Sequence, residues 1–346
     1  MFTPIVSMTW KLVRPLIFLC DSEFIHNLST FLIRSFYQVF GRAILRIKVG
    51  GPITAPHPST PIIGLAAGFD KNAEWLPTLP SFGFQFTEIG TVTPRPQSGN
   101  DKPRLFREVS NQTLFNRMGF NNLGATMIAE RLRDVKPTLP QGFEVGVNIG
   151  KNKNTRNDDA ALDYAAALSP FAELVDYAVI NVSSPNTVGL RDLQTLESLF
   201  PIVQASQNVI LSWKKSIPLY VKLAPEVSGE SLSDLIQGLE SKGIDGFILT
   251  NTLAGQYTHE GQALSGGWSG SCLTETSLER LKQARSMTKK TLISVGGIMS
   301  GAHAIERIQA GADRIQVYSG WIYGGPSFPW QLRSQLDNTL VSQSNR

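Results

Sequence analysis

The sequence has few of the residues that build metal centres and disulfide frameworks. It contains two cysteines, Cys20 and Cys272, in unrelated contexts, and its four histidines are scattered without metal-ligand spacing. We therefore expect neither a metal site nor a disulfide framework. A Gly-x-Gly-x-x-Gly turn after a strand is also missing, which disfavours an open dinucleotide-binding sheet.

Long apolar runs are missing as well. No run reaches the roughly 18 residues that a membrane span needs. The longest early run, residues 16–20, stops at Asp21 and is not followed by a cleavage site. We therefore expect neither a membrane span nor a secretory signal. The N-terminus also lacks an Arg- and Ser-rich presequence, which favours a bacterial protein over a mitochondrial one.

The positive charge is concentrated at the N-terminus. Residues 1–50 hold six Lys or Arg residues against two acidic residues, which accounts for the whole net charge of +4. Apolar residues recur in this segment at three- and four-residue steps, which predicts helices, with Ser22 as an N-cap. Such a segment suits an anionic membrane surface, and packing on the main core is the alternative. Nucleic-acid binding is disfavoured because no aromatic-basic groove motif is present.

From residue 60 onward, short β-rich runs alternate with helical stretches. Eight such runs predict an α/β fold, a (β/α)8 TIM barrel with a small N-terminal helical extension. A small hairpin is expected after the second strand, from 104–109 and 113–118. The predicted strands are 61–67, 85–91, 144–149, 177–183, 218–224, 246–251, 292–297 and 314–319. The predicted domains are the helical segment 1–50, a linker at 51–60, the barrel at 61–335 and a C-terminal tail at 336–346.

Small, amide, hydroxyl and lysine side chains collect where the predicted strands end, which is where barrel enzymes perform their chemistry. Asp70 is almost the only carboxylate among them. This composition disfavours a metal site or a glycosidase carboxylate pair, and it favours an anionic, carbonyl-rich ligand. Gly297 and residues 318–320 follow the last two strands, at the usual phosphate site of such barrels.

The segment 181–187, Asn-Val-Ser-Ser-Pro-Asn-Thr, follows one of these strands. Its two carboxamides can donate and accept hydrogen bonds, so they suit a planar ligand with alternating carbonyl and N–H groups. Ser184 between them can accept a proton where the site desolvates it and passes the proton on. The alternative interpretation is a polar turn that caps a helix.

Five long segments resemble the dihydroorotate dehydrogenases of class 2, the membrane-associated, quinone-reducing branch of that flavin-enzyme family. Class 1 enzymes carry cysteine where this chain has Ser184, and the basic N-terminal segment favours class 2 independently. The resemblance implies oxidation of dihydroorotate to orotate in pyrimidine (UMP) synthesis, with FMN as cofactor and a membrane quinone as second substrate. The matching segments are 64–71, 88–97, 116–122, 148–153 and 181–187.

The resemblance also implies roles for individual residues. Ser184 would take the C5 proton, and Lys222 would stabilise the anionic reduced flavin. The implied substrate contacts are Lys71, Asn116, Arg117, Met118, Gly119, Phe120, Asn181, Asn186, Asn251 and Thr252. The implied FMN contacts are Ala67, Gly68, Phe69, Asp70, Lys71, Thr91, Asn148, Asn181, Lys222, Thr250, Gly270, Gly297, Tyr318 and Ser319. The implied quinone site comprises His26, Arg107 and Tyr318.

The same resemblance implies a monomer bound peripherally to the cytoplasmic side of the inner membrane, with the mitochondrial inner membrane as the alternative. The chain departs from the family pattern at Trp268, where leucine is usual, and along the loop 253–272, which can change loop closure. Another flavin barrel, such as a dihydropyrimidine-type reductase or a dihydrouridine synthase, would need a cysteine as proton donor, but Cys272 is far from the Ser184 loop in the sequence. A binding protein that kept the barrel but lost catalysis would have lost the polar residues at the strand ends, whereas this chain retains them.

Overall fold

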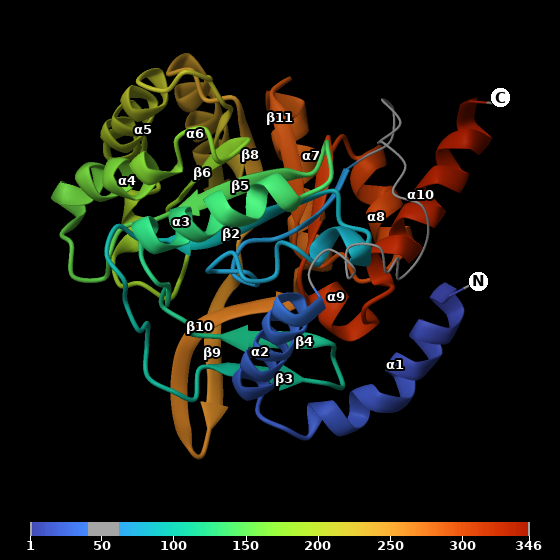
Figure 1. Ribbon diagram of the computed structural model, residues 1–346. Coiled ribbons are helices and arrows are strands. Elements are labelled where there is room, and N and C mark those ends of the chain that lie inside the picture. Colours follow the sequence, from blue (N-terminus) through green and yellow to red (C-terminus); the bar gives the residue numbers. More distant parts are fainter. Residues whose placement is uncertain (1, 41–61, 345–346) are drawn as a thin grey trace.

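The computed structural model describes residues 2–40 and 62–344 (Figure 1). In this part of the chain, eight parallel strands close into a barrel in the order β1-β12-β11-β8-β7-β6-β5-β2. The strands are β1 (Ile62–Leu65), β2 (Phe86–Val92), β5 (Glu144–Ile149), β6 (Tyr177–Asn181), β7 (Leu219–Leu223), β8 (Gly246–Leu249), β11 (Thr291–Val295) and β12 (Arg314–Val317). The predicted TIM barrel is therefore confirmed, and each predicted strand matches one observed strand to within two residues at either end.

Helices surround this barrel and cover its outer face (Figure 1). They are α3 (Ala125–Val135), α4 (Ala160–Leu168), α5 (Leu196–Leu211), α6 (Gly229–Ser241), α7 (Thr274–Met287), α8 (Gly301–Gln309), α9 (Ser319–Gly324) and α10 (Phe328–Ser344). Strands β2, β6 and β7 are buried along their whole length, as is usual for parallel strands that are covered on both sides. One apolar cluster, which includes Phe86, Tyr177 and Ile293, is separate from the larger core.

A second, four-stranded sheet lies at the barrel mouth, in the order β3-β4-β10-β9. The predicted hairpin forms β3 (Leu105–Glu108) and β4 (Thr113–Asn116), as expected. The loop expected at 253–272 is instead largely a second hairpin, β9 (Leu253–His259) and β10 (Gln262–Gly270). Its Trp268 packs on Phe115 of β4, with ring centroids 5.0 Å apart. The departure from the family pattern at residue 268 is thus accommodated by an aromatic contact.

Two helices precede the barrel, α1 (Phe2–Phe18) and α2 (Ser22–Phe40), and α2 lies beside β3 (Figure 1). The helical prediction for residues 1–50 is confirmed over 2–18 and 22–40, and a short turn at 19–21 joins the two helices. Residues 41–50 and the predicted linker 51–60 lie outside the described part. The N-cap prediction is wrong by one residue, because Asp21 Oδ1 accepts the Phe24 N–H and Ser22 begins the helix. No described helix is long and apolar enough to cross a bilayer.

The C-terminal end of the chain differs from the predicted tail at 336–346. Helix α10 continues through this segment as far as Ser344, without a break at 336. Leu336 is buried in the main core. The segment is therefore the second half of a helix that packs on the barrel rather than a separate tail.

Candidate active site

A pocket opens between the C-terminal ends of the barrel strands and the β3-β4-β10-β9 sheet. Most of the predicted site residues line it. Among the predicted residues, its walls contain Ala67, Gly68, Lys71, Thr91, Asn116, Met118, Gly119, Phe120, Asn181, Ser184, Asn186, Lys222, Thr250, Asn251, Thr252, Gly270, Gly297, Tyr318 and Ser319. The chain brings these residues together from segments more than 200 positions apart. The walls do not include Phe69, Asp70, Arg117 or Asn148.

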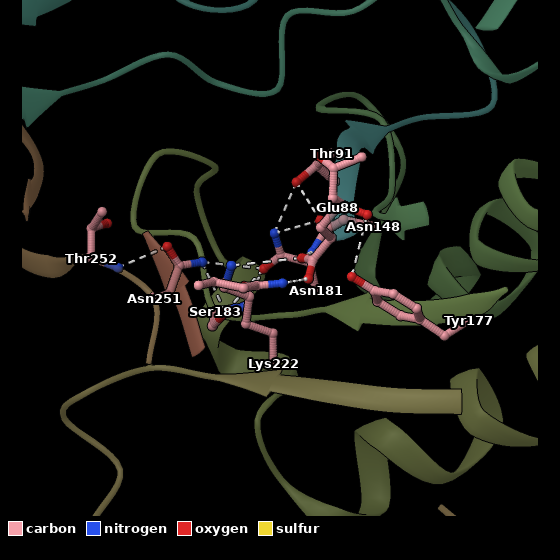
Figure 2. Close-up of polar contacts among 11 residues, drawn as sticks. Glu88, Thr91, Asn148, Tyr177, Asn181, Ser183, Lys222, Asn251 and Thr252 are labelled. Carbon is pink, nitrogen blue, oxygen red and sulfur yellow. Dashed lines mark hydrogen bonds and ion pairs between the residues drawn. The ribbon is translucent and has the colours of Figure 1, made fainter. Parts of the chain in front are cut away.

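The floor of the pocket is a network of side-chain hydrogen bonds across four strand ends (Figure 2). Asn148 Oδ1 accepts from Thr91 Oγ1 at 2.5 Å and from Asn181 Nδ2 at 2.9 Å. Asn251 Nδ2 donates to Asn181 Oδ1 at 3.3 Å and to Ser183 Oγ at 2.9 Å. Each amide thereby has one fixed orientation. Asn148 is fully buried and does not line the cavity, so its side chain supports the other floor residues from behind.

A buried carboxylate completes this floor, and the sequence analysis missed it. Glu88 of β2 has no solvent exposure. Its Oε1 accepts from Asn148 Nδ2 and its Oε2 from Gln316 Nε2, both at 2.7 Å. Lys222 Nζ lies 3.7 Å from Glu88 Oε1. A glutamate inside an otherwise apolar strand was the available signal, because a carboxylate is almost never fully buried unless it is paired.

Ser184 lies in a tightly bonded loop after β6. Its side chain is buried, and its Oγ accepts the N–H of Asn186 at 3.2 Å. Asn186 Nδ2 donates to Asn116 Oδ1 at 2.7 Å. Arg191 fixes the loop from behind, since its Nε donates to the carbonyl of Ser183 at 2.9 Å. Asn186 Oδ1 is buried and has no hydrogen-bond partner among the described residues, so it is open to a ligand N–H.

Lys71 places a cation at the edge of the same pocket. Part of its surface remains exposed within the cavity, but the surrounding protein desolvates the ammonium group and lowers its pKa to about 8. The neighbouring Asp70 turns away from the pocket. Its carboxylate accepts the backbone N–H groups of Glu74, Trp75 and Leu76 at 2.7–3.1 Å. Burial raises the pKa of Asp70 to about 6, and its observed role is to hold the turn after β1.

Bare backbone lines the far end of the pocket, after β11 and β12. Gly297 has a φ of +69°, and a Cβ atom there would lie 2.3 Å from Thr274 Cα, so only glycine fits. Ser319 Oγ and Ser269 Oγ, which also line this pocket, are 3.0 Å apart. Backbone N–H groups and hydroxyls without a nearby carboxylate suit a phosphate group, as expected at this position of a barrel.

A second, mainly apolar cavity of about 370 Å³ lies between the N-terminal helices and the barrel. The three predicted quinone-site residues, His26, Arg107 and Tyr318, all line it. Tyr318 also lines the first pocket, so it stands between the two. Burial lowers the pKa of His26 to about 3, so the imidazole is neutral at physiological pH. The Arg107 guanidinium carbon lies 4.7 Å from the centroid of the Phe18 ring.

The remaining predicted residues support these walls from outside. Phe69 packs between the rings of Trp75, Trp321 and His26, with centroids 4.7–5.1 Å from its own. Arg117 donates its backbone N–H to the carbonyl of Arg104 at 2.9 Å. Phe69 lines the second cavity but not the first, and Arg117 lines neither.

Comparison with known proteins agrees with this geometry. The family model described as dihydroorotate dehydrogenase matches residues 59–340. The dihydroorotate dehydrogenase (quinone) of Dichelobacter nodosus is 43% identical over 326 residues, covering 91% of this chain and 94% of that protein. The enzyme of the same name from Anaeromyxobacter dehalogenans is 39% identical over 346 residues, covering 96% and 93%.

Solved structures show the same relationship. The crystal structure of the Eimeria tenella dihydroorotate dehydrogenase in complex with ferulenol has a TM-score of 0.81 and 32% sequence identity, covering 94% of this chain and 93% of that one. A ligand-free crystal structure of the dihydroorotate dehydrogenase from Eimeria tenella has a TM-score of 0.79. The chain therefore belongs to the dihydroorotate dehydrogenase family of flavin oxidoreductases, in its quinone-dependent class 2.

Proposed function

We propose that the protein oxidises (S)-dihydroorotate to orotate in pyrimidine (UMP) synthesis and that Ser184 takes the C5 proton. The reaction removes a proton from C5 and a hydride from C6, and a C5–C6 double bond forms. As the Ser184 hydroxyl takes the C5 proton, its own proton must pass on to solvent. FMN would supply the acceptor for the hydride, and a membrane quinone would take up the electrons. The observation that carries the proposal is the buried Ser184 hydroxyl beside a floor of oriented carboxamides.

The amide groups provide the binding edge for the planar substrate. Asn116, Asn186 and Asn251 line the pocket, and the unpaired Asn186 Oδ1 can accept a ring N–H. Donors that bind the ring carbonyl next to C5 make the C5 proton more acidic. Burial of Ser184 removes the water that would otherwise compete for its hydroxyl. Lys71 adds a positive charge where the substrate carboxylate needs one.

The residues fit FMN at both of its ends. Gly297 and Ser319 leave room and donors for the phosphate. Lys222, which is buried beside Glu88 and lines the pocket, would hold a cation near the flavin ring, where it would favour the reduced, anionic form. Ala67, Gly68, Thr91 and Thr250, which are also predicted FMN contacts, line the same pocket.

The electrons leave on the side of the N-terminal helices. The apolar cavity lined by His26 and Arg107 suits a quinone ring and the start of its apolar tail. Along α1, α2 and the turn between them, large apolar side chains are exposed, and Lys11 of α1 is exposed as well. The apolar residues include Met8, Leu12, Leu16, Leu19, Phe24 and Phe31. This surface supports a monomer bound to an anionic membrane, on the cytoplasmic side of a bacterial inner membrane.

Anaerobic absorbance spectroscopy of the purified protein tests the proposal. We expect dihydroorotate to bleach the flavin band, and a short-chain quinone to restore it where fumarate and NAD do not. A flavin that ignores dihydroorotate would indicate another flavin barrel. A protein that takes up no FMN would contradict the enzyme role altogether.

A further inference from the structure

A buried ion pair ties helix α2 to the barrel mouth. Glu23, in the first turn of α2, accepts two hydrogen bonds from Arg104, from Nε at 3.0 Å and from Nη2 at 2.8 Å. Each residue is only 6% exposed, so the pair is removed from solvent screening. Lys102 Nζ lies 3.4 Å from the same carboxylate. Two parallel bonds to one carboxylate fix the direction of the guanidinium as well as its position.

The same guanidinium holds the loop that precedes β3. Arg104 Nη1 donates to the carbonyls of Ser98 and Asn100 at 2.6 and 2.7 Å. One side chain thus joins the first turn of α2 to residues 98–100. Because both sets of bonds use the same planar group, a displacement of Glu23 is transmitted to this loop.

Asn100 continues the path to the Ser184 loop. Its Nδ2 donates to the carbonyl of Asn186 at 3.1 Å and to the carbonyl of Arg117 at 3.0 Å. The N–H of Asn186 in turn donates to Ser184 Oγ at 3.2 Å. The Asn100 side chain packs tightly against Gly119, because a Cβ atom placed on that glycine would lie only 2.8 Å from Asn100 Cγ. The Asn100 side chain therefore has little freedom to move. Every non-covalent step from Glu23 to Ser184 is therefore a hydrogen bond of 3.2 Å or less.

We propose that Glu23 and Asn100 are positioning residues, which act through Arg104 and Asn186 to hold Ser184 in its reactive arrangement. The inference rests on the proposed role of Ser184 as the base. It means that α2, the helix that lines the quinone cavity, also sets the rate of the dihydroorotate half-reaction. Loss of the Glu23 charge would leave Arg104 buried without its counter-charge, and the loop that Arg104 holds would relax.

The chain offers a matched control for this coupling. Arg34 of α2 also pairs with the barrel, through Glu74 at 2.7 Å. Glu74 in turn pairs with Arg131 of α3 at 3.2 Å, on a path that does not include the Ser184 loop. Arg34→Gln therefore breaks a bond between α2 and the barrel without touching the route to the base.

The experiment uses the full-length flavoprotein and anaerobic stopped-flow bleaching by dihydroorotate, with no quinone present. We expect Glu23→Gln and Asn100→Ala each to lower the rate constant of bleaching, roughly twofold to thirtyfold, with the final amplitude unchanged. Arg34→Gln should react at nearly the wild-type rate. The double variant should be no slower than the slower single variant, because both changes interrupt one path.

Hydrogen–deuterium exchange of the protein without substrate gives a readout that does not depend on turnover. Glu23→Gln and Asn100→Ala should accelerate exchange in residues 182–190, and Arg34→Gln should not. Equal slowing by Glu23→Gln and Arg34→Gln would overturn the proposal, as would unchanged exchange at 182–190.

If Glu23→Gln does not fold, Asn100→Ala at its partly exposed position provides the same test. A wild-type flavin that dihydroorotate fails to bleach contradicts the proposed function itself, whereas wild-type bleaching with unaffected variants contradicts only the coupling.

Discussion

Lys222 Nζ lies 3.7 Å from Glu88 Oε1 at the floor of the pocket, where both side chains are almost completely shielded from water. The carboxylate also accepts from Asn148 and Gln316, so each of its oxygens has a partner. Lys222, the cation that we propose stabilises the reduced flavin, is thus paired with an anion that belongs to the barrel itself. The electrostatics of the site are part of the core and not an addition to its surface.

The buried pair should be costly to break. We expect Glu88→Gln to lower the free energy of unfolding by about 3–5 kcal/mol, because Lys222 would remain buried without its counter-charge. Urea unfolding followed by circular dichroism measures this. Glu144→Gln is the control, since its pairing with Arg314 is partly exposed and should contribute only about 1 kcal/mol or less. Equal losses in the two variants would show that the Glu88 pair has no special role.

Removal of the proposed base should separate binding from chemistry. Ser184→Ala should retain FMN and bind orotate, because the amide floor does not depend on the Ser184 hydroxyl. Flavin reduction by dihydroorotate should slow by roughly 10²- to 10⁴-fold, the usual loss for a positioned base. Stopped-flow spectroscopy measures the rate.

The adjacent serine provides the control for this variant. Ser183 is equally buried, but its hydroxyl bonds to Asn181 Oδ1 and Asn251 Nδ2 within the floor. Ser183→Ala should weaken orotate binding more than it slows the chemical step. Near-normal flavin reduction in Ser184→Ala would remove Ser184 from the role of base.

Substrate binding should depend on pH through Lys71. Its pKa is lowered to about 8, so the ammonium form is present below pH 8 and is lost above it. The ligand is an anion, so the Kd for orotate should rise as pH increases from 7 to 9, by up to about tenfold per unit once the lysine is neutral. Spectral titration of the flavoprotein measures Kd. Lys71→Met should bind orotate weakly at every pH in this range, and a pH dependence that persists in that variant would assign it to another group.

The strand ends could be predicted from the sequence because the signal there is local. Asn181, Ser184 and Asn186 follow an apolar run directly, and a closed barrel brings such ends together without further information. Asp70 shows the limit of this reasoning. It follows a strand in the same way, yet its carboxylate caps three backbone N–H groups of its own turn. Position at a strand end does not specify the direction of a side chain.

The features that sequence reasoning missed depend on partners far along the chain. Glu88 is tied to Gln316 across the closure of the barrel, 228 positions away. The β9–β10 hairpin is completed by β4, where Trp268 pairs with Phe115. Residues 253–259 do alternate between exposed and half-buried positions, which is a weak strand signal. Without the partner strand, a solvent-facing hairpin and a polar loop look the same.

The proposed quinone cavity gives a prediction in which the two half-reactions respond differently. Ser29 of α2 lines the apolar cavity but not the first pocket, so Ser29→Phe should fill space needed by the quinone. We expect reoxidation of the reduced flavin by a short-chain quinone to slow at least about tenfold, a barrier increase of about 1.4 kcal/mol. Bleaching by dihydroorotate should keep its wild-type rate, because the path from Glu23 to Ser184 does not include this residue.

Leu28→Phe is the matched control, since Leu28 is 39% exposed on the same helix and lines neither cavity. Both rates come from anaerobic stopped-flow mixing in sequence, and a Ser29→Phe protein that reduces quinone as fast as Leu28→Phe would place the quinone elsewhere.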